Sequence, residues 1–94
     1  CGGLNGALMA LGAVLGRRTH QDSTDRVYAA AKRLVREFEG EFGSRSCQDL
    51  LDGCDLGTPQ GQAMFREHGF QGRCREFTVR AAEMAGRILA ELRR

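Results

Sequence analysis

An uncharged stretch opens the chain and spans residues 1–16. Its leucines recur at helical spacing and would form one large apolar ridge of a helix. These are Leu4, Leu8, Leu11 and Leu15. Glycine and alanine fill the other faces, and close packing has to offset the roughly 1 kcal/mol that each helical glycine costs. Because a helix that is apolar all round is buried, we expect a central helix wrapped by the others, with Cys1 at its N-terminal mouth.

Two further apolar stripes of helical period predict two long amphipathic helices. The first helix is expected to start near residues 22–25 and to end at Gly40 or Gly43. Its stripe consists of Val27, Ala31, Leu34, Val35, Phe38 and Phe42. The second helix begins around Cys74 and continues to the C-terminus. Its stripe consists of Phe77, Ala81, Met84, Ala85, Ile88, Leu89 and Leu92.

Two short helices are predicted between the long ones. Ser46 and Asp49 fit the capping box, in which a serine and an acid three residues later satisfy backbone amides at a helix start. This pattern predicts a helix over residues 47–51. The Thr58-Pro59 pair predicts another over about residues 59–68, because threonine is a good N-cap and proline suits the first helical position.

The fold class expected from these patterns is all-α, since no segment alternates with period two. We predict a small helical bundle in which the two long amphipathic helices pack on the central Gly/Ala-rich helix. The short helices would serve as connections. A chain of 94 residues makes one domain, residues 1–94, around a single modest core.

Charge is nearly balanced along the chain. Fourteen basic and twelve acidic residues give a net charge of +2, and the two signs alternate instead of forming a basic stripe. A nucleic-acid-binding protein would concentrate its basic residues on one face. We therefore expect no nucleic-acid partner, and no membrane partner either, because the apolar stretch is shorter than the ~20 residues that cross a bilayer.

The start of the chain also bears on its class. Residue 1 is not methionine, so we expect a preceding segment. No basic region precedes the apolar stretch, unlike in a signal peptide. A mature lipoprotein also begins with cysteine but continues as a polar tether, whereas Cys1 is followed directly by the apolar helix.

The chain contains four cysteines, at positions 1, 47, 54 and 74. In a small secreted domain they would indicate two disulfides, whereas in a cytosolic domain they more often indicate metal binding or redox chemistry. The apolar periodicity is sufficient for folding without covalent links. We therefore favour the second case and expect a cytoplasmic protein.

Three of the cysteines, Cys1, Cys47 and Cys74, lie at or just before a predicted helix start. Unpaired amides and the positive end of the helix dipole favour a thiolate there. Neighbouring arginines act in the same direction, at Arg45 before Cys47 and at Arg73 and Arg75 on either side of Cys74. A thiolate is the form that attacks disulfides and binds metals.

Cys54 follows Gly53 on a short loop, from which it could swing toward Cys47 and resolve a disulfide. The alternative interpretation is that the cysteines are only small buried hydrophobic residues.

Other candidate ligands are two histidines and three carboxylates. His20 and His68 could bind a metal beside cysteines, although we favour the interpretation that both are exposed surface residues. Asp49, Asp52 and Asp55 surround Cys54, where helix capping and turn formation account for them and a metal role is the alternative. No nucleotide-binding loop, nucleophile elbow or HExxH pattern occurs.

Three segments together resemble the C_GCAxxG_C_C family of redox-active proteins. They are the Cys-Gly-x-x-x-Gly-Ala-Leu-Met-x-Leu-Gly run from Cys1 to Gly12, the Phe-Gly-Ser-x-x-Cys-x-x-Leu-Leu-x-Gly-Cys-Asp-Leu run from Phe42 to Leu56, and Cys74 before an apolar helix. The resemblance covers nearly all of the chain. It implies a further helix before Cys1 and a cluster of the four cysteines at a redox or metal site.

Three hypotheses follow. In the first, the protein is redox-active and uses clustered cysteines for thiol–disulfide exchange or electron transfer with a redox partner protein. As a thiol–disulfide oxidoreductase, it would attack with Cys47 or Cys74 and resolve with Cys54 or Cys1. In the second, Cys1, Cys47, Cys54 and Cys74 hold zinc or an iron–sulfur cluster. In the third, the domain is structural or binds a partner. The remaining exposed surface of the apolar helix is expected to need the preceding helix or a second subunit, which makes a homodimer possible.

Overall fold

The structure is a computed structural model of the whole chain, described here for residues 1–19 and 21–92. Its helices are α1 (Gly2–Leu15), α2 (Asp25–Phe42), α3 (Cys47–Leu50), α4 (Pro59–Glu67) and α5 (Gln71–Leu92). The described residues contain no strand, so the prediction of an all-α fold is confirmed. None of these helices is long and apolar enough to cross a membrane.

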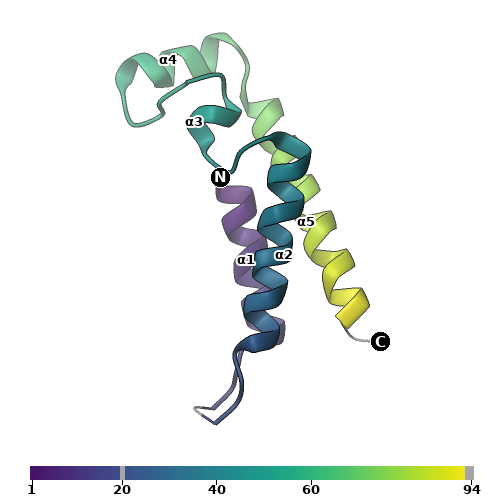
Figure 1. Cartoon of the computed structure of the whole chain (residues 1–94). Helices are drawn as coiled ribbons and strands as arrows, with labels where there is room; N and C mark the ends of the chain where they lie inside the picture. The colour runs from purple at the N-terminus through teal and green to yellow at the C-terminus, as the bar shows by residue number, and fades with distance from the viewer. Residues whose placement is uncertain (20, 93–94) are drawn as a thin grey trace.

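The three long helices form the body of the molecule (Figure 1). Helix α1 packs on both α5 and α2, and α2 also packs on α5. The short helices α3 and α4 lie beyond one end of this bundle, beside the N-terminus, while the C-terminus lies at the other end (Figure 1). We call residues 44–70, which contain α3 and α4, the arm.

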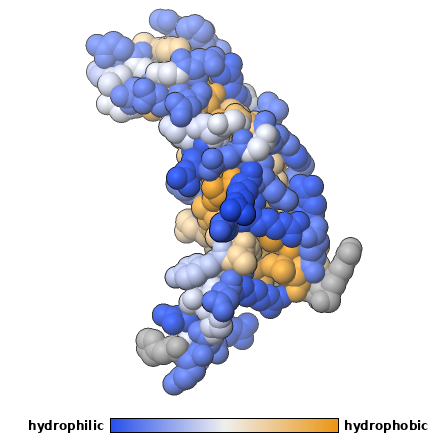
Figure 2. All heavy atoms as spheres, viewed as in Figure 1, coloured by the Kyte–Doolittle hydropathy of each residue, from blue (hydrophilic) through white to orange (hydrophobic). Residues whose placement is uncertain are grey.

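One continuous core joins the three long helices, and it uses most of the predicted apolar stripes. In α2, however, Ala30 is buried, whereas the predicted Ala31 and Val35 are only partly buried. The fully buried side chains of the bundle include Leu11, Leu34, Phe38 and Ile88. Phe77 of α5 meets Phe38 edge-on, with ring centroids 6.3 Å apart. On the face shown in Figure 2, hydrophobic residues gather along the middle of the bundle and hydrophilic residues cover its outer surfaces.

Helix α1 is buried on one face and exposed on the other. Its buried side chains are Leu4, Ala7, Leu11 and Leu15. The opposite face carries no charge but is open to solvent, and Met9 on that face is 76 % exposed. The helix therefore lies against its two neighbours instead of being wrapped on all sides as expected. The exposed apolar surface that was predicted to remain is present.

Most predicted helix ends agree with the structure, but α5 begins at Gln71, three residues before the predicted start around Cys74. Gly43 ends α2 with a φ of 83°, the left-handed conformation that glycine adopts without strain. Thr58 caps α4, accepting a 3.0 Å hydrogen bond from the Gly61 amide, with Pro59 at the first turn. The predicted capping box at α3 is wrong. The Ser46 side chain makes no capping bond. The Asp49 carboxylate accepts from the Ser44 hydroxyl at 3.1 Å, and the Ser46 amide donates to the Ser44 hydroxyl oxygen at 3.0 Å instead of to Asp49.

Candidate functional site

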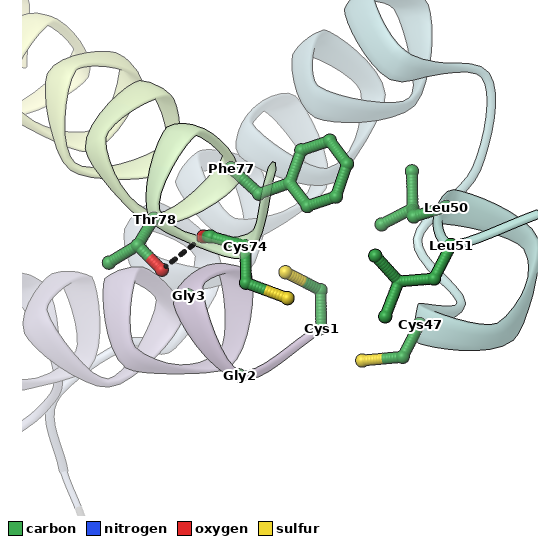
Figure 3. Close-up of a pocket in the computed structure, with 9 residues that line it drawn as sticks. All are labelled: Cys1, Gly2, Gly3, Cys47, Leu50, Leu51, Cys74, Phe77 and Thr78. Carbon is green, nitrogen blue, oxygen red and sulfur yellow. Dashed lines mark hydrogen bonds between the residues drawn. The ribbon is translucent and has the colours of Figure 1, made fainter. Parts of the chain in front are cut away.

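A pocket of about 310 Å³ lies where the N-terminal ends of α1, α3 and α5 meet (Figure 3). Its walls are apolar, apart from thiols and one threonine hydroxyl. The lining residues are Cys1, Gly2, Gly3, Cys47, Leu50, Leu51, Cys74, Phe77 and Thr78. Since these come from segments far apart in the sequence, the pocket exists only in the folded chain. We call it the thiol pocket.

Three of the four cysteines point into the thiol pocket. Figure 3 shows the side chains of Cys1 and Cys74 beside one another, with their sulfurs directed into the same space. The Cys47 sulfur points toward this space from the α3 side. Cys1 and Cys74 are half-buried and Cys47 is exposed, and all three are free thiols. Helix packing thus gathers three thiol groups that are separated by tens of residues in the sequence.

Close packing of α1 on α5 places Cys1 beside Cys74. A Cβ atom on Gly3 would lie only 2.6 Å from the Cα of Thr78, so only glycine permits this approach. Thr78 follows Cys74 by one helical turn, and its hydroxyl donates to the Cys74 carbonyl at 3.0 Å (Figure 3). The backbone nitrogen of Cys1 also donates to the Arg45 carbonyl at 3.0 Å, which ties the start of α1 to the arm.

The environment of Cys74 raises the pKa of its thiol. Burial is the largest cause, followed by the negative charge that Cys47 would carry, and Cys54 adds a smaller contribution in the same direction. The positive charge of Arg73 lowers the pKa and opposes them. The net direction is opposite to our prediction of a thiolate favoured at a helix start. Cys74 is the fourth residue of α5, and its amide is already bonded to the Phe70 carbonyl at 3.0 Å.

Cys54 occupies a different environment from the other cysteines. Only 1 % of it is exposed, and its sulfur donates to the carbonyl of Gly61 at 3.0 Å. Gly61 itself lies against the backbone of the preceding turn, where a Cβ atom added to Gly61 would lie 1.7 Å from the backbone oxygen of Asp55. Cys54 does not line the thiol pocket. To reach Cys47, as the sequence suggested, it would have to leave the core of the arm.

The remaining candidate ligands have structural partners. His68 is exposed at the end of α4, with Nδ1 3.0 Å from the Met64 carbonyl, and it stacks on Phe70. Asp55 accepts from the amide of Gly57 at 2.9 Å, as expected for a turn residue. His20 lies outside the described residues.

A metal site also needs several ligands in one place. Within residues 1–19 and 21–92, no three or more histidine, cysteine or acidic side chains are grouped so as to hold a metal ion. The zinc or iron–sulfur hypothesis stays a prediction.

Sequence reasoning missed two contacts that shape the site. One is the approach of Gly3 to Thr78, which nothing in the local pattern of either segment indicates. The other joins Arg73 to Asp52, whose Oδ2 accepts from Nη1 at 3.0 Å. The Asp52-Gly53 pair is a turn signal and could have indicated that this carboxylate is displayed at the edge of the arm.

A family model described as "Putative redox-active protein (C_GCAxxG_C_C)" matches residues 1–88. The chain belongs to this family. The resemblance noted in the sequence is therefore confirmed, and the family description indicates redox activity. No curated protein and no solved structure matches the chain. As a C_GCAxxG_C_C protein, this chain has three thiols at one pocket, an arrangement that suits redox chemistry.

Proposed function

We propose that the protein is a thiol–disulfide oxidoreductase whose reaction takes place in the thiol pocket. The observation that carries this proposal is that Cys1, Cys47 and Cys74 reach one pocket from three separate helices as free thiols. Thiol–disulfide exchange requires an accessible attacking thiol and a second thiol within reach. The exposed thiol can meet a substrate, and the half-buried thiols beside it can take the resolving role.

Cys47 is the attacking thiol in this proposal, because it is the exposed member of the set. Its thiolate attacks one sulfur of a substrate disulfide, forms a mixed disulfide and releases the first substrate thiolate. Cys74 then attacks the Cys47 sulfur, so that the Cys47–Cys74 bond forms and the second substrate thiolate leaves. Two electrons pass from protein to substrate, and two protons from the protein thiols end on the two substrate thiols.

Cys74 suits the resolving step. Its raised pKa disfavours the thiolate, which makes Cys74 a poorer first attacker than an unburied thiol. A mixed disulfide at Cys47 removes the Cys47 charge, one cause of the raised pKa, and so makes the Cys74 thiolate easier to form. Cys1, directed toward Cys74, can exchange with the Cys47–Cys74 bond and hold Cys74 in a second, more buried disulfide. The reaction suits the cytoplasm, where disulfides are usually transient and belong to catalytic or redox-sensing cysteines. A disulfide of a redox partner protein is one substrate that would fit this chemistry.

The test is a thiol titration with metal analysis on protein purified without oxygen. We expect four free thiols, of which two are lost on mild oxidation with a disulfide and recovered with a reductant. Cys74→Ser should abolish formation of the internal disulfide. Cys54→Ser is the matched control, because a hydroxyl can keep the bond to the Gly61 carbonyl and the residue lies outside the pocket.

Two results would contradict the proposal. One is that all four thiols stay unchanged in the presence of the oxidant. The other is stoichiometric iron or zinc with masked thiols, which would make the cysteines ligands and support the metal-binding hypothesis.

A further inference from the structure

Arg73 links the two sides of the thiol pocket. Its Nη1 donates to the carbonyl of Leu50 at 3.3 Å and to the Asp52 carboxylate at 3.0 Å. Its guanidinium carbon lies 4.7 Å from the centre of the Phe70 ring, a cation–π contact. The Arg73 side chain, next to Cys74, is therefore hydrogen-bonded to the end of α3 and to the turn that follows it. Helix α3 is the helix that begins with Cys47.

The segment that Arg73 contacts also forms a wall of the thiol pocket. Leu50 and Leu51, which line the pocket, directly precede Asp52. Among the described residues, Asp52 is the only one other than glycine with a positive φ, at 57°. This left-handed conformation costs roughly 1–2 kcal/mol for most residues, and aspartate adopts it more readily. It brings the carboxylate to Arg73.

Few other links hold the arm at this position. The long helices pack on one another, whereas α3 and α4 lie beyond the end of the bundle (Figure 1). The buried apolar side chains of the arm are Leu50, Leu51, Cys54 and Phe70. Polar contacts between arm and bundle include the Cys1–Arg45 backbone bond, an exposed Arg45–Glu39 ion pair at 3.8 Å, the bond from the Cys74 amide to the Phe70 carbonyl, and the contacts of Arg73. The distance between Cys47 and Cys74 thus depends on whether the arm stays seated.

We propose that Arg73 is a positioning residue that seats the arm so that Cys47 stays within reach of Cys74. This inference rests on the proposed function. The Arg73–Asp52 pair alone contributes little, because both side chains are substantially exposed and such pairs are worth about 0–1 kcal/mol in water. The carbonyl bond and the ring contact add to it, and all three depend on the planar guanidinium. Lysine could preserve the charge but not the set of contacts.

The experiment uses Cys1→Ser/Cys54→Ser protein, in which Cys47 and Cys74 are the only thiols. It is equilibrated with glutathione buffers of known ratio, and the fraction of Cys47–Cys74 disulfide gives the effective concentration of one thiol at the other. Arg73→Gln should lower this value by roughly three- to tenfold, the range expected for a few partly exposed contacts. Arg75→Gln, on the other side of Cys74, is the matched control and should leave it unchanged.

A second variant tests the contact from the arm side and guards against misfolding. Asp52→Asn removes the ion pair, while asparagine tolerates the left-handed conformation. It should lower the effective concentration by less than Arg73→Gln, since the Leu50 carbonyl bond survives. The double variant should be no worse than Arg73→Gln alone, because both changes remove the same link.

The pH profile of Cys74 alkylation distinguishes the electrostatic effect of Arg73 on the Cys74 pKa from its positioning effect on the arm. Arg73→Lys should keep the profile of the parent protein while still lowering the effective concentration. Arg73→Gln should shift the profile to higher pH, because the cation that lowers the Cys74 pKa is lost.

The two proposals fail in different ways. If the parent protein forms no Cys47–Cys74 disulfide in any buffer, the proposed function is wrong. If the disulfide forms but Arg73→Gln behaves like Arg75→Gln, only the positioning role is wrong.

Discussion

At the scale of single residues, opposing influences meet at Cys74. Burial and the charges of Cys47 and Cys54 favour its neutral thiol, and the Arg73 cation favours its thiolate. The first group is stronger, so folding holds the proton on Cys74 more tightly than an unfolded chain would. A helix start was expected to do the reverse, but the cost of desolvating a thiolate, the largest cause of the shift, outweighs the effect of the Arg73 cation.

This balance predicts a pH dependence of stability. Because the folded pKa of Cys74 lies above the unfolded value of about 8.5, its contribution is fully present below that pH and is lost as pH rises through the folded pKa. We expect the unfolding free energy of the reduced protein to fall with pH more steeply than that of Cys74→Ser. Urea denaturation between pH 7 and pH 10 under anaerobic reducing conditions measures this.

Cys47→Ser supplies the control for that prediction. It removes the second-largest cause of the raised pKa, so the extra pH dependence due to Cys74 should shrink. A difference between the parent protein and Cys74→Ser that stays constant with pH, or grows in favour of the parent, would mean that the fold favours the thiolate after all.

At the scale of helices, the decisive contact is between α1 and α5. Gly3 lets the two backbones meet at Thr78, and this contact sets Cys1 beside Cys74. The glycines of α1 are not equivalent, however. A Cβ atom on Gly12 would meet no atom within 4 Å, outside its own helix and its chain neighbours. Gly3 is therefore needed for the packing of α1 on α5, whereas Gly12 lies on an exposed surface and makes no such contact.

This difference predicts opposite effects of two alanine substitutions. Gly3→Ala should destabilise the protein by about 1–3 kcal/mol, because backbone atoms of α5 have to move away. Gly12→Ala should stabilise it by up to about 1 kcal/mol through helix propensity alone. Thermal or urea unfolding of the reduced proteins gives both values. Equal stabilisation by both substitutions would show that α1 and α5 do not approach closely at Thr78.

The helices themselves could be predicted, because apolar period, glycine and the Thr58-Pro59 pair are local signals. The contacts between helices could not. The Ser46 and Asp49 pattern failed because Ser44, two residues before Ser46, competes for the same carboxylate. Family resemblance suggested that the cysteines cluster, but the burial of Cys54 away from the pocket depends on how α4 packs within the arm, where the Gly61 carbonyl accepts from the Cys54 sulfur.

At the scale of the whole molecule, the fold is elongated. Its radius of gyration is 15.4 Å, whereas a compact domain of this length has about 12 Å. The extension has two sources, the length of the bundle and the arm beyond its end (Figure 1). The thiol pocket lies between these two parts, with Cys1 and Cys74 on the bundle and Cys47 on the arm. A disulfide that includes Cys47 would therefore join the arm covalently to the bundle.

The consequence concerns cooperativity. In the reduced protein, backbone amides of the arm should exchange with deuterium through local opening, well before those at the centre of α2 and α5. A Cys47–Cys74 bond forbids much of that opening, so protection in the arm should rise toward that of the bundle. Hydrogen exchange read by mass spectrometry on both redox forms, with Cys47→Ser as the unlinked control, measures this. Equal protection in both forms would mean that the arm and the bundle already unfold as one unit. If protection in the arm rises only in the oxidised form, the redox state of the Cys47–Cys74 pair decides whether this chain has one cooperative folding unit or two.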